Sequence, residues 1–345
     1  MLRFECDYTE GCIPEILDAI TKENHTQLCG YSQDPVCDRA RQKIKALCGG
    51  EDVDVHFLVG GTQANTTVIA ATLRPYQGVI SATPGHINCH ETGAIEATGH
   101  KVLAIESKTG RLSAEQIDRC CAAHWSDSTH EHIVQPGMVY LSHPAENGTL
   151  YSLKELQQIR AVCDKWSLPL FVDGARLGYG LASPVNDVGI ADLAKLTDVF
   201  YIGGTKCGAL MGEAVVIQND LIKRDFRYMI KRQGGMLAKG WLLGLQFDVL
   251  LEDDLYLKVC KKAVDLALKI KKAFEEKGCK FLIESHTNQQ FPILHRDILK
   301  KFDANYAYSF WEQVDDDHAA VRFCTSWATT ETQVNALISD IQKFL

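Results

Sequence analysis

Two short segments, Phe171-Val-Asp173-Gly-Ala-Arg176 and Phe200-Tyr-Ile-Gly-Gly-Thr-Lys206, decide the fold of this chain. In each segment an apolar, strand-forming run ends in polar or charged residues beside small ones. Runs of the same kind recur between helical patterns such as 63–73 and 152–166; they are 56–59, 79–81, 138–141, 168–172, 199–202 and 214–217. Near-continuous apolar strands separated by helices predict an α/β fold whose parallel or mixed sheet is covered on both faces.

The pattern changes after about Gly240. A long helix with a charged face is expected, then short alternating segments and a final helix, over 254–277, 290–294, 320–324 and 331–345. This change indicates a smaller α+β domain that follows the sheet domain. We therefore predict an N-terminal arm over 1–30, an α/β domain over 31–240 and a small α+β domain over 241–345.

The composition is that of an ordinary globular protein: 345 residues, 46% of them hydrophobic and 23% charged, with a formal net charge of −8. This acidic balance leaves no basic stripe, so nucleic acid and anionic membranes are not expected partners. The first residues, Met1 to Asp7, mix in charges and lack the apolar core of a signal peptide. Apolar stretches such as 241–247 are too short to span a bilayer. We expect a cytoplasmic protein.

The chain has 13 cysteines, an odd number at irregular spacing, and we interpret most of them as reduced, buried thiols. One group of possible metal ligands stands out in the sequence: Cys120, Cys121, His124, His130 and His132. Because paired Cys-x-x-Cys spacing is missing, a helix end that runs into a polar loop explains this group better than zinc does. We predict no metal site.

The two opening segments have the layout expected of a pyridoxal phosphate (PLP) site. A lysine amine such as that of Lys206 can form a Schiff base with the cofactor aldehyde. The Asp173 carboxylate can keep the pyridine nitrogen protonated, so that the ring accepts electrons, and Arg176 can bind a substrate carboxylate. The alternative is that Asp173 and Lys206 form a structural ion pair. In sheets of this kind ligands bind beyond the carboxyl ends of the strands, which is where these residues fall.

A phosphate needs a cradle, and Gly60, Gly61 and Thr62 provide one between a strand and a helix. The glycines let the backbone approach an anion, Thr62 offers a hydroxyl, and the helix contributes free amides at its N-terminus. Ordinary turn chemistry explains Gly-Gly-Thr about as well. His86 follows the next strand, where its ring could stack on the pyridine or simply belong to a loop.

Taken together, these motifs resemble the threonine aldolase branch of the fold-type I PLP enzymes, often grouped with the β-eliminating lyases. The segments Glu5-Cys-Asp-Tyr-Thr9 and Gly30-Tyr-Ser-Gln-Asp-Pro35 resemble the family's opening segments as well. The resemblance covers nearly the whole chain. It implies a mostly parallel seven-stranded sheet with a smaller C-terminal domain, and a homodimer or homotetramer.

The resemblance also implies roles for individual residues. Lys206 would be the Schiff-base lysine, Asp173 the partner of the pyridine nitrogen and His86 the stacking residue, while Gly60, Gly61 and Thr62 would hold the phosphate. Arg176 and Arg322 would bind the substrate carboxylate. A surface ion pair is the alternative for each arginine, and for Arg322 in particular.

The chain departs from the family at three places. Cys6 stands where a serine near the substrate carboxylate is common, and a thiol is a weaker hydrogen-bond donor. Glu146 replaces a histidine that is a candidate base or hydroxyl-orienting group, so either Glu146 or His143 would take over its role, or the stereochemical preference would relax. Leu237 replaces an arginine that a neighbouring subunit donates to the phosphate, and Lys239 could supply that charge.

The resemblance implies an aldolase that cleaves β-hydroxy-α-amino acids, such as L-threonine and L-allo-threonine, to glycine and an aldehyde. Other PLP chemistries on the same scaffold, namely β-elimination, racemisation and transamination, remain open because they use the same lysine and aspartate. A catalytically silent binding homologue is the alternative from another class of protein. A nicotinamide dehydrogenase is disfavoured because no Gly-x-Gly-x-x-Gly follows the first strand.

Overall fold

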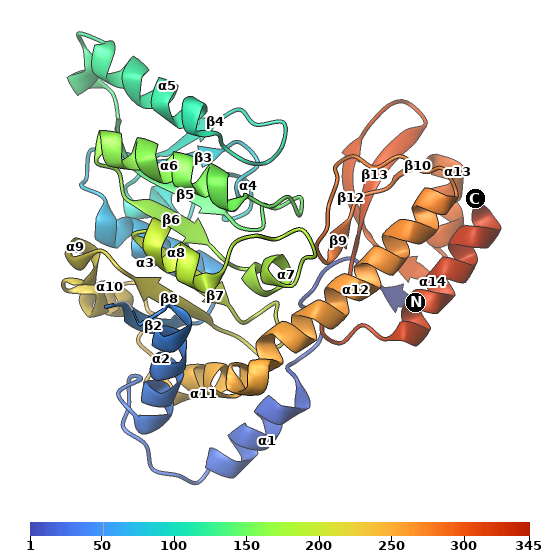
Figure 1. The fold of residues 1–345 in the computed structure, drawn as a ribbon, viewed down its shortest axis with the longest axis horizontal. Helices are drawn as coiled ribbons and strands as arrows, with labels where there is room; N and C mark the ends of the chain where they lie inside the picture. The colour runs from blue at the N-terminus through green and yellow to red at the C-terminus, as the bar shows by residue number, and fades with distance from the viewer. Residues whose placement is uncertain (51) are drawn as a thin grey trace.

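The structure is a computed structural model that describes residues 1–50 and 52–345. A large body carries the main sheet, and a smaller lobe holds both the N- and C-termini (Figure 1). Within the described residues seven strands form the main sheet, in the order β2 (Asp54–Leu58), β8 (Glu213–Ile217), β7 (Val199–Gly203), β6 (Leu170–Asp173), β5 (Gln135–Ser142), β3 (Gln77–Ala82) and β4 (Val102–Ile105). β8 runs in the direction opposite to that of the other six strands. This arrangement confirms the predicted mostly parallel, seven-stranded sheet.

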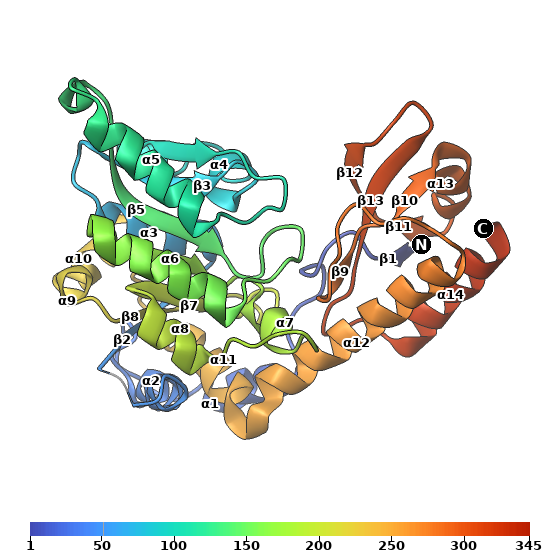
Figure 2. The ribbon, with the colours of Figure 1, turned by 45° about the horizontal axis from the view of Figure 1, so that its top comes forward.

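The central strands are buried on both faces, which is why they are apolar throughout. In β7, Phe200 and Ile202 pack into one apolar core while Val199 and Tyr201 pack into another on the opposite face, as the alternation of side chains along a strand requires. Helices cover both faces (Figure 2). Those that contribute to the first core include α2 (Pro35–Leu47), α5 (Ala114–Ser126), α6 (Leu153–Trp166), α7 (Leu177–Leu181), α8 (Ile190–Leu196) and α11 (Trp241–Leu250). Those of the second are α3 (Gly61–Thr72), α4 (His86–Cys89), α9 (Asp220–Lys223) and α10 (Phe226–Arg232).

The helix boundaries follow local signals in the sequence. Ser152 caps α6: its hydroxyl accepts a hydrogen bond from the Glu155 amide, and the Glu155 carboxylate accepts one from the Ser152 amide. This reciprocal capping box satisfies amides that a helix start leaves unpaired. The predicted helix 152–166 therefore begins one residue later than expected, with Ser152 as its cap.

The small lobe has an antiparallel sheet of its own. Strands β10 (Ile293–His295), β13 (His318–Cys324) and β12 (Ser309–Gln313) lie side by side, and β9 (Gln289–Gln290) also pairs with β13. The strand β1 (Leu2–Arg3) pairs with β11 (Tyr306–Ala307), which ties the N-terminus to this lobe. The small lobe also contains the helices α13 (Arg296–Phe302) and α14 (Glu331–Phe344).

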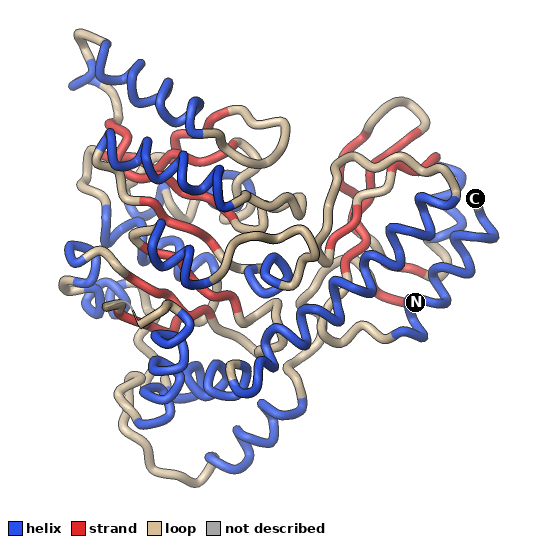
Figure 3. The backbone as a smooth tube through the Cα atoms, in the orientation of Figure 1, coloured by secondary structure: helices blue, strands red, loops and turns tan. Residues whose placement is uncertain are grey.

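A long helix, α12 (Leu255–Glu276), joins the two bodies, while α1 (Pro14–Glu23) lies beside α11 (Figures 1 and 3). One face of α12 is buried, including Ala263, Leu266 and Ile270, because it packs against α7 and α14. The domain limits at residues 30 and 240 stay a prediction. Among the described residues no helix is long and apolar enough to cross a membrane.

One strand of the sheet was not predicted. In β4, which is four residues long, only Val102 is fully buried, because β4 lies at the edge of the sheet. Its sequence is apolar throughout, but a run of only four residues cannot be told from a helix segment by periodicity alone. The predicted strands at 56–59, 79–81, 138–141, 168–172, 199–202 and 214–217 all correspond to observed ones, and no end moves by more than three residues.

Candidate active site

A cavity of about 620 Å³ lies at the carboxyl ends of the parallel strands, and β12 and β13 of the small lobe contribute to its wall. Residues that the sequence predicts for the site and that line this cavity are Gly60, Gly61, Thr62, His86, Glu146, Asp173, Arg176, Lys206 and Arg322. They come from the carboxyl end of β6, from the segments that follow β2, β3, β5, β6 and β7, and from β13. The fold therefore brings together residues that are up to 262 positions apart, from Gly60 to Arg322.

Asp173, the last residue of β6, is buried and hydrogen-bonded on both carboxylate oxygens. The Tyr201 hydroxyl and the Ala175 amide donate to Oδ1, at 2.5 and 3.0 Å, while Tyr140 and Asn65 donate to Oδ2, at 2.6 and 3.1 Å. Burial alone raises the pKa of Asp173, but the His86 charge and the tyrosine hydrogen bonds outweigh it, so the pKa lies below its usual value. Asp173 is thus held as an anion that can stabilise a buried positive charge.

His86 begins α4 at the wall of the cavity. Its Nδ1 atom lies 2.8 Å from Glu91 Oε1, and the Glu91 side chain is fully buried. Asn65 donates to the same Glu91 oxygen and also to Asp173. This chain of contacts fixes the orientation of the imidazole relative to Asp173, as a stacking role requires.

Lys206 follows β7 and is buried. In the described part of the chain its Nζ atom has no hydrogen bond or ion pair; the nearest aromatic ring contact is Tyr8, whose centroid is 6.0 Å away. Burial and the neighbouring Arg176 charge lower the pKa of Lys206. A lysine of this kind is a better nucleophile than a solvated one because more of it is unprotonated. The alternative of a structural ion pair with Asp173 is not found in the structure.

Arg176 is not a surface residue. Its Nε and Nη2 atoms donate to the two carboxylate oxygens of Asp7, at 2.7 and 3.0 Å, and the Asp7 side chain is fully buried. Asn288 also donates to Asp7, at 2.9 Å. This bidentate pairing orients the guanidinium and leaves Nη1 for a ligand in the cavity.

Arg322 reaches the cavity from β13. Its Nη2 donates to the Glu5 carbonyl oxygen at 2.6 Å and its Nη1 to Gln289 at 3.1 Å. The guanidinium carbon lies 5.7 Å from the centroid of the Trp311 ring, which also lines the cavity. Unlike Arg176, Arg322 has no ion-pair partner in the described residues, so its charge is available to an anion.

Glu146 places a buried carboxylate on the cavity wall. Its Oε1 atom accepts from the Ser142 hydroxyl at 2.6 Å and from the His86 amide at 2.8 Å. Its Oε2 atom is buried and has no hydrogen-bond partner among the described residues. Burial, with a smaller contribution from the Asp173 charge, raises the pKa of Glu146. The free oxygen and the raised pKa suit a proton acceptor.

His143 points away from the cavity. It is fully buried, its Nδ1 accepts a long hydrogen bond of 3.4 Å from the Tyr151 amide, and burial lowers its pKa to about 4. Of the two residues that the sequence offered as a base, the geometry therefore favours Glu146. The peptide bond between His143 and Pro144 is cis.

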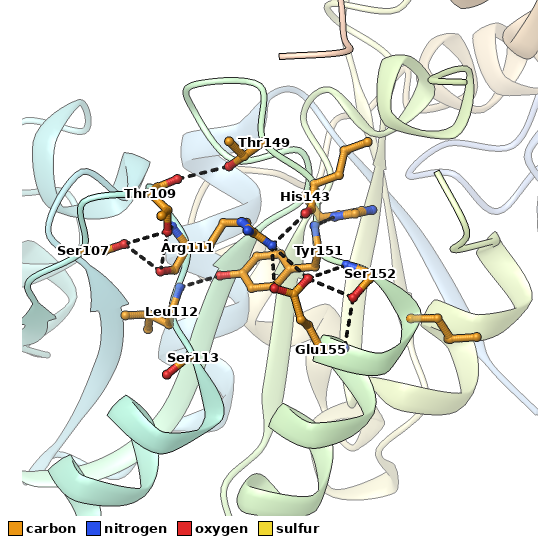
Figure 4. Close-up of polar contacts among 12 residues, drawn as sticks. Ser107, Thr109, Arg111, Leu112, Ser113, His143, Thr149, Tyr151, Ser152 and Glu155 are labelled. Atoms are coloured by element: carbon orange, nitrogen blue, oxygen red, sulfur yellow. Dashed lines mark hydrogen bonds and ion pairs between the residues drawn. The ribbon is translucent and has the colours of Figure 1, made fainter. Parts of the chain in front are cut away.

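A polar network holds the 143–152 loop that carries Glu146 (Figure 4). Arg111 donates to the Leu150 carbonyl oxygen and to both oxygens of Glu155, each at 2.8 Å. The Tyr151 hydroxyl accepts from the Leu112 amide at 2.7 Å. These bonds tie the loop to the segment before α5 and to the start of α6, so the position of Glu146 depends on residues outside the cavity.

Two predicted site residues do not line the cavity. Cys6 is partly buried, and burial raises its pKa. Lys239 is exposed to solvent. The role of Lys239 belongs to a neighbouring subunit in the resemblance, so it stays a prediction, as does that of Cys6.

The predicted group of cysteine and histidine residues belongs to α5 and the turn after it. Cys121 packs into the first apolar core, and the rings of His124 and His130 meet edge to face with centroids 5.7 Å apart. In residues 1–50 and 52–345 no group of three or more His, Cys, Asp or Glu side chains is placed to hold a metal ion.

Comparison with known proteins identifies the family. A family model described as "Beta-eliminating lyase" matches residues 8–297. The chain belongs to the beta-eliminating lyase family. This lyase is 30% identical to a low specificity L-threonine aldolase from a Pseudomonas species, over 99% of this chain and 97% of the relative. It is 29% identical to a protein of the same description from Pseudomonas aeruginosa, with the same coverage.

Solved structures agree with this assignment. The lyase superposes on a Leishmania major threonine aldolase with a TM-score of 0.96, at 42% identity and over 99% of both chains. A Thermus thermophilus aspartate aminotransferase matches with a TM-score of 0.72 at 13% identity, which shows a shared fold alone. The predicted fold-type I architecture is therefore confirmed.

The family depends on pyridoxal phosphate, and the cavity of this lyase fits that cofactor. Gly60 caps α3, where a side chain would project into open space, and a Cβ atom on Gly61 would lie 3.1 Å from the Tyr201 hydroxyl. The amides of the first turn of α3 lack partners within the helix and can bind an anion. The same cavity also contains the Asp173 anion and the amine of Lys206, which has no hydrogen bond or ion pair among the described residues.

Several residues of the site were missed. Tyr140 and Tyr201 donate hydrogen bonds to Asp173. Because side chains alternate between the two faces along a strand, the sequence could have indicated that both tyrosines lie on the face of the sheet that Asp173 and Gly61 occupy. Asp7 gave no local signal, because its partner Arg176 is 169 positions away. Glu213 also lines the cavity; a glutamate that begins an apolar strand was a visible signal.

Proposed function

We propose that this chain is a PLP-dependent aldolase that cleaves β-hydroxy-α-amino acids, with L-threonine and L-allo-threonine as substrates, to glycine and an aldehyde. One observation carries the proposal: Lys206, Asp173, His86 and Glu146 line one cavity together with two arginines. The similarity to proteins described as threonine aldolases supports it further. Bound in the cavity, PLP supplies an electron sink for the electrons of a bond broken at the substrate Cα atom.

The protein's own residues prepare this chemistry. Lys206 would hold the cofactor through its amine, which is available as the free base because burial and the Arg176 charge lower its pKa. Asp173 remains anionic because four donors bind its oxygens, so it stabilises a proton on a nitrogen placed against it. His86, oriented by Glu91, restrains the face of a planar ring. These residues orient and polarise the reacting groups without moving a proton themselves.

Two arginines bind and orient the substrate. Arg322 and the Nη1 atom of Arg176 hold the substrate carboxylate, which fixes rotation about the Cα atom. Glu146 then accepts the proton of the β-hydroxyl group at its free Oε2 atom. The O–H electrons form the aldehyde C=O bond as the Cα–Cβ bond breaks, and the aldehyde leaves. Cα then takes up one proton, which balances the proton that Glu146 accepted from the hydroxyl group, and glycine results.

The assembly and location are proposals that rest on the resemblance and the composition. We propose a homodimer or homotetramer in the cytoplasm, with an amino acid as the small-molecule partner. Light scattering of the purified protein measures the subunit number.

The experiment that tests the function is a product assay on the purified, PLP-loaded protein. L-Threonine, L-allo-threonine and phenylserine are supplied separately, and aldehyde and glycine are quantified; serine is supplied in parallel, with pyruvate as the readout for β-elimination. Stoichiometric aldehyde and glycine support the aldolase. Pyruvate from serine without any aldehyde from the three β-hydroxy amino acids would replace it with a β-eliminating activity.

A further inference from the structure

Glu213 lines the cavity but takes no part in the reaction proposed above. It is the first residue of β8, which lies between β2 and β7 in the main sheet. In the strand register it pairs with Leu58 of β2 on one side and with Gly203 of β7 on the other. The chain continues from Leu58 to the Gly60-Gly61 cradle and from Gly203 to Lys206. Glu213 therefore lies where the parallel strands end, between the strand that leads to the cradle and the strand that leads to Lys206.

The surroundings of Glu213 do not suit a carboxylate anion. The residue is 3% exposed and lines the cavity. Its Oε2 atom accepts one hydrogen bond, from the Gly204 amide at 3.2 Å, and in the described part of the chain no Lys, Arg or His lies within ion-pair distance. A buried carboxylate without a cation is costly, so such groups take up a proton instead.

The charged and titratable groups around Glu213 come from two neighbouring strands. Lys206 follows β7 and favours the anion, whereas Asp173 at the end of β6 opposes it; Tyr201 of β7 also lies close enough to be affected by its charge. Residues 60–62, at the start of α3, contribute no charged side chain. Burial is the largest influence and raises the pKa of Glu213 to about 8, against the hydrogen bonds from Thr205 and Gly204.

The cradle has no cation of its own to place against a phosphate. Gly60, Gly61, Thr62 and Thr205 line this part of the cavity and offer only amides and hydroxyls. Lys239, which the resemblance offers only from a neighbouring subunit, is exposed in its own chain and does not line the cavity there. Because Glu213 lines the same cavity as the cradle, its side chain would repel a phosphate dianion held there as an anion and would donate a hydrogen bond to it as a neutral acid.

We propose that Glu213 binds the cofactor phosphate as a neutral carboxyl group that donates a hydrogen bond, in place of a basic residue. The inference rests on the proposed function, since it requires PLP in this cavity. It assigns a phosphate-binding role to an acidic residue. The affinity for the phosphate group then depends on protonation of Glu213, whereas the affinity for the pyridoxal ring does not.

The test compares the affinities of PLP and of pyridoxal, which lacks the phosphate. The dissociation constants of both are measured by absorbance titration of the cofactor-free protein between pH 7 and 9.5. In this range the phosphate is already a dianion, since its second pKa is about 6. Any pH dependence of Lys206 or of the ring affects both ligands and cancels in the ratio of the two dissociation constants, which isolates the phosphate.

We expect the preference of the wild-type protein for PLP over pyridoxal to fall about 30-fold from pH 7 to pH 9.5, because at a pKa of about 8 only about one molecule in 30 is protonated at the upper limit. In Glu213→Gln, which keeps a neutral donor, the ratio stays flat. The matched control is Glu146→Gln, the same change in another buried acid of this cavity, and it keeps the wild-type slope.

The inference is overturned if the wild-type ratio does not change with pH, or if Glu213→Gln retains the slope. The wild-type titration decides this alone if the variant does not fold. Binding of both ligands with a flat ratio removes only the role of Glu213. If neither PLP nor pyridoxal binds at any pH, the proposed function fails, and this inference fails with it.

Discussion

The buried pair of Asp7 and Arg176 offers a quantitative test of the site, through the substitution Asp7→Asn. This change keeps the size of the side chain but removes the charge that faces Arg176. The guanidinium loses a bidentate partner at 2.7 and 3.0 Å. Since the Asp7 side chain is fully buried and that of Arg176 is 11% exposed, water cannot replace the lost contact. The variant leaves a buried, uncompensated positive charge.

The magnitude follows from the pKa of Asp7. Burial raises this pKa, but the charges of Arg176 and Lys206, with the hydrogen bonds from Arg176 and Asn288, outweigh it and bring the pKa from 3.8 down to about 2. A difference of about 1.8 pKa units corresponds to about 2.4 kcal/mol, and breaking a buried pair costs about 3–5 kcal/mol in general. We expect Asp7→Asn to lower the free energy of unfolding by about 2–4 kcal/mol at pH 7. Because the folded pKa is depressed, this contribution is complete above pH 4 and disappears as the pH falls towards 2.

The assay is urea unfolding of Asp7→Asn beside the wild type at pH 7 and in acid. Asp38→Asn is the matched control, since Asp38 pairs with Arg41 at 2.7 Å but its side chain is 68% exposed. Exposed pairs contribute about 0–1 kcal/mol. Asp7→Asn should also raise KM more than it lowers kcat, because Arg176 loses its orientation. A stability within about 0.5 kcal/mol of wild type at pH 7 would refute the buried-pair account.

Three further changes test other parts of the site. In the wild type, kcat should fall at low pH because Glu146 accepts a proton only above its raised pKa. Glu146→Gln should abolish this fall, and kcat measured from pH 5 to 9 shows whether it is lost. Tyr151→Phe should leave the Leu112 amide unpaired and cost about 1–3 kcal/mol in urea unfolding; a loss as small as that of the exposed control would contradict the proposed anchoring of the loop. Arg322→Lys should raise KM for threonine while leaving the PLP absorbance unchanged, and altered cofactor binding would place Arg322 elsewhere in the site.

Most of the fold was predictable because its central strands are apolar on both faces. Strands such as 199–202 and 214–217 are continuous hydrophobic runs, and only a covered sheet buries both sides of them. The direction of β8 was not predictable from such a run, because parallel and antiparallel central strands have the same apolar pattern. The edge strand β4 was missed although its four residues are all apolar, because so short a run cannot be told from a helix segment by periodicity alone.

The site was predictable where a motif is local and not where it depends on distant contacts. Asp173, Arg176 and Lys206 each follow a strand, so the topology places them at one edge of the sheet. The pairing of Arg176 with Asp7 joins residues 169 positions apart and left no local pattern. The choice of Glu146 over His143 depended on which side chain the loop turns into the cavity, a question of packing that sequence spacing does not answer.

The most direct test of the central claim is release of aldehyde and glycine from L-threonine and L-allo-threonine by the PLP-loaded wild type, measured beside Lys206→Ala. Our account predicts equimolar products from the wild type, a loss of activity in Lys206→Ala to the level without enzyme, and a ratio between the two substrates that changes in Glu146→Gln. Undiminished aldehyde release by Lys206→Ala, or none from a PLP-bound wild type, would contradict it.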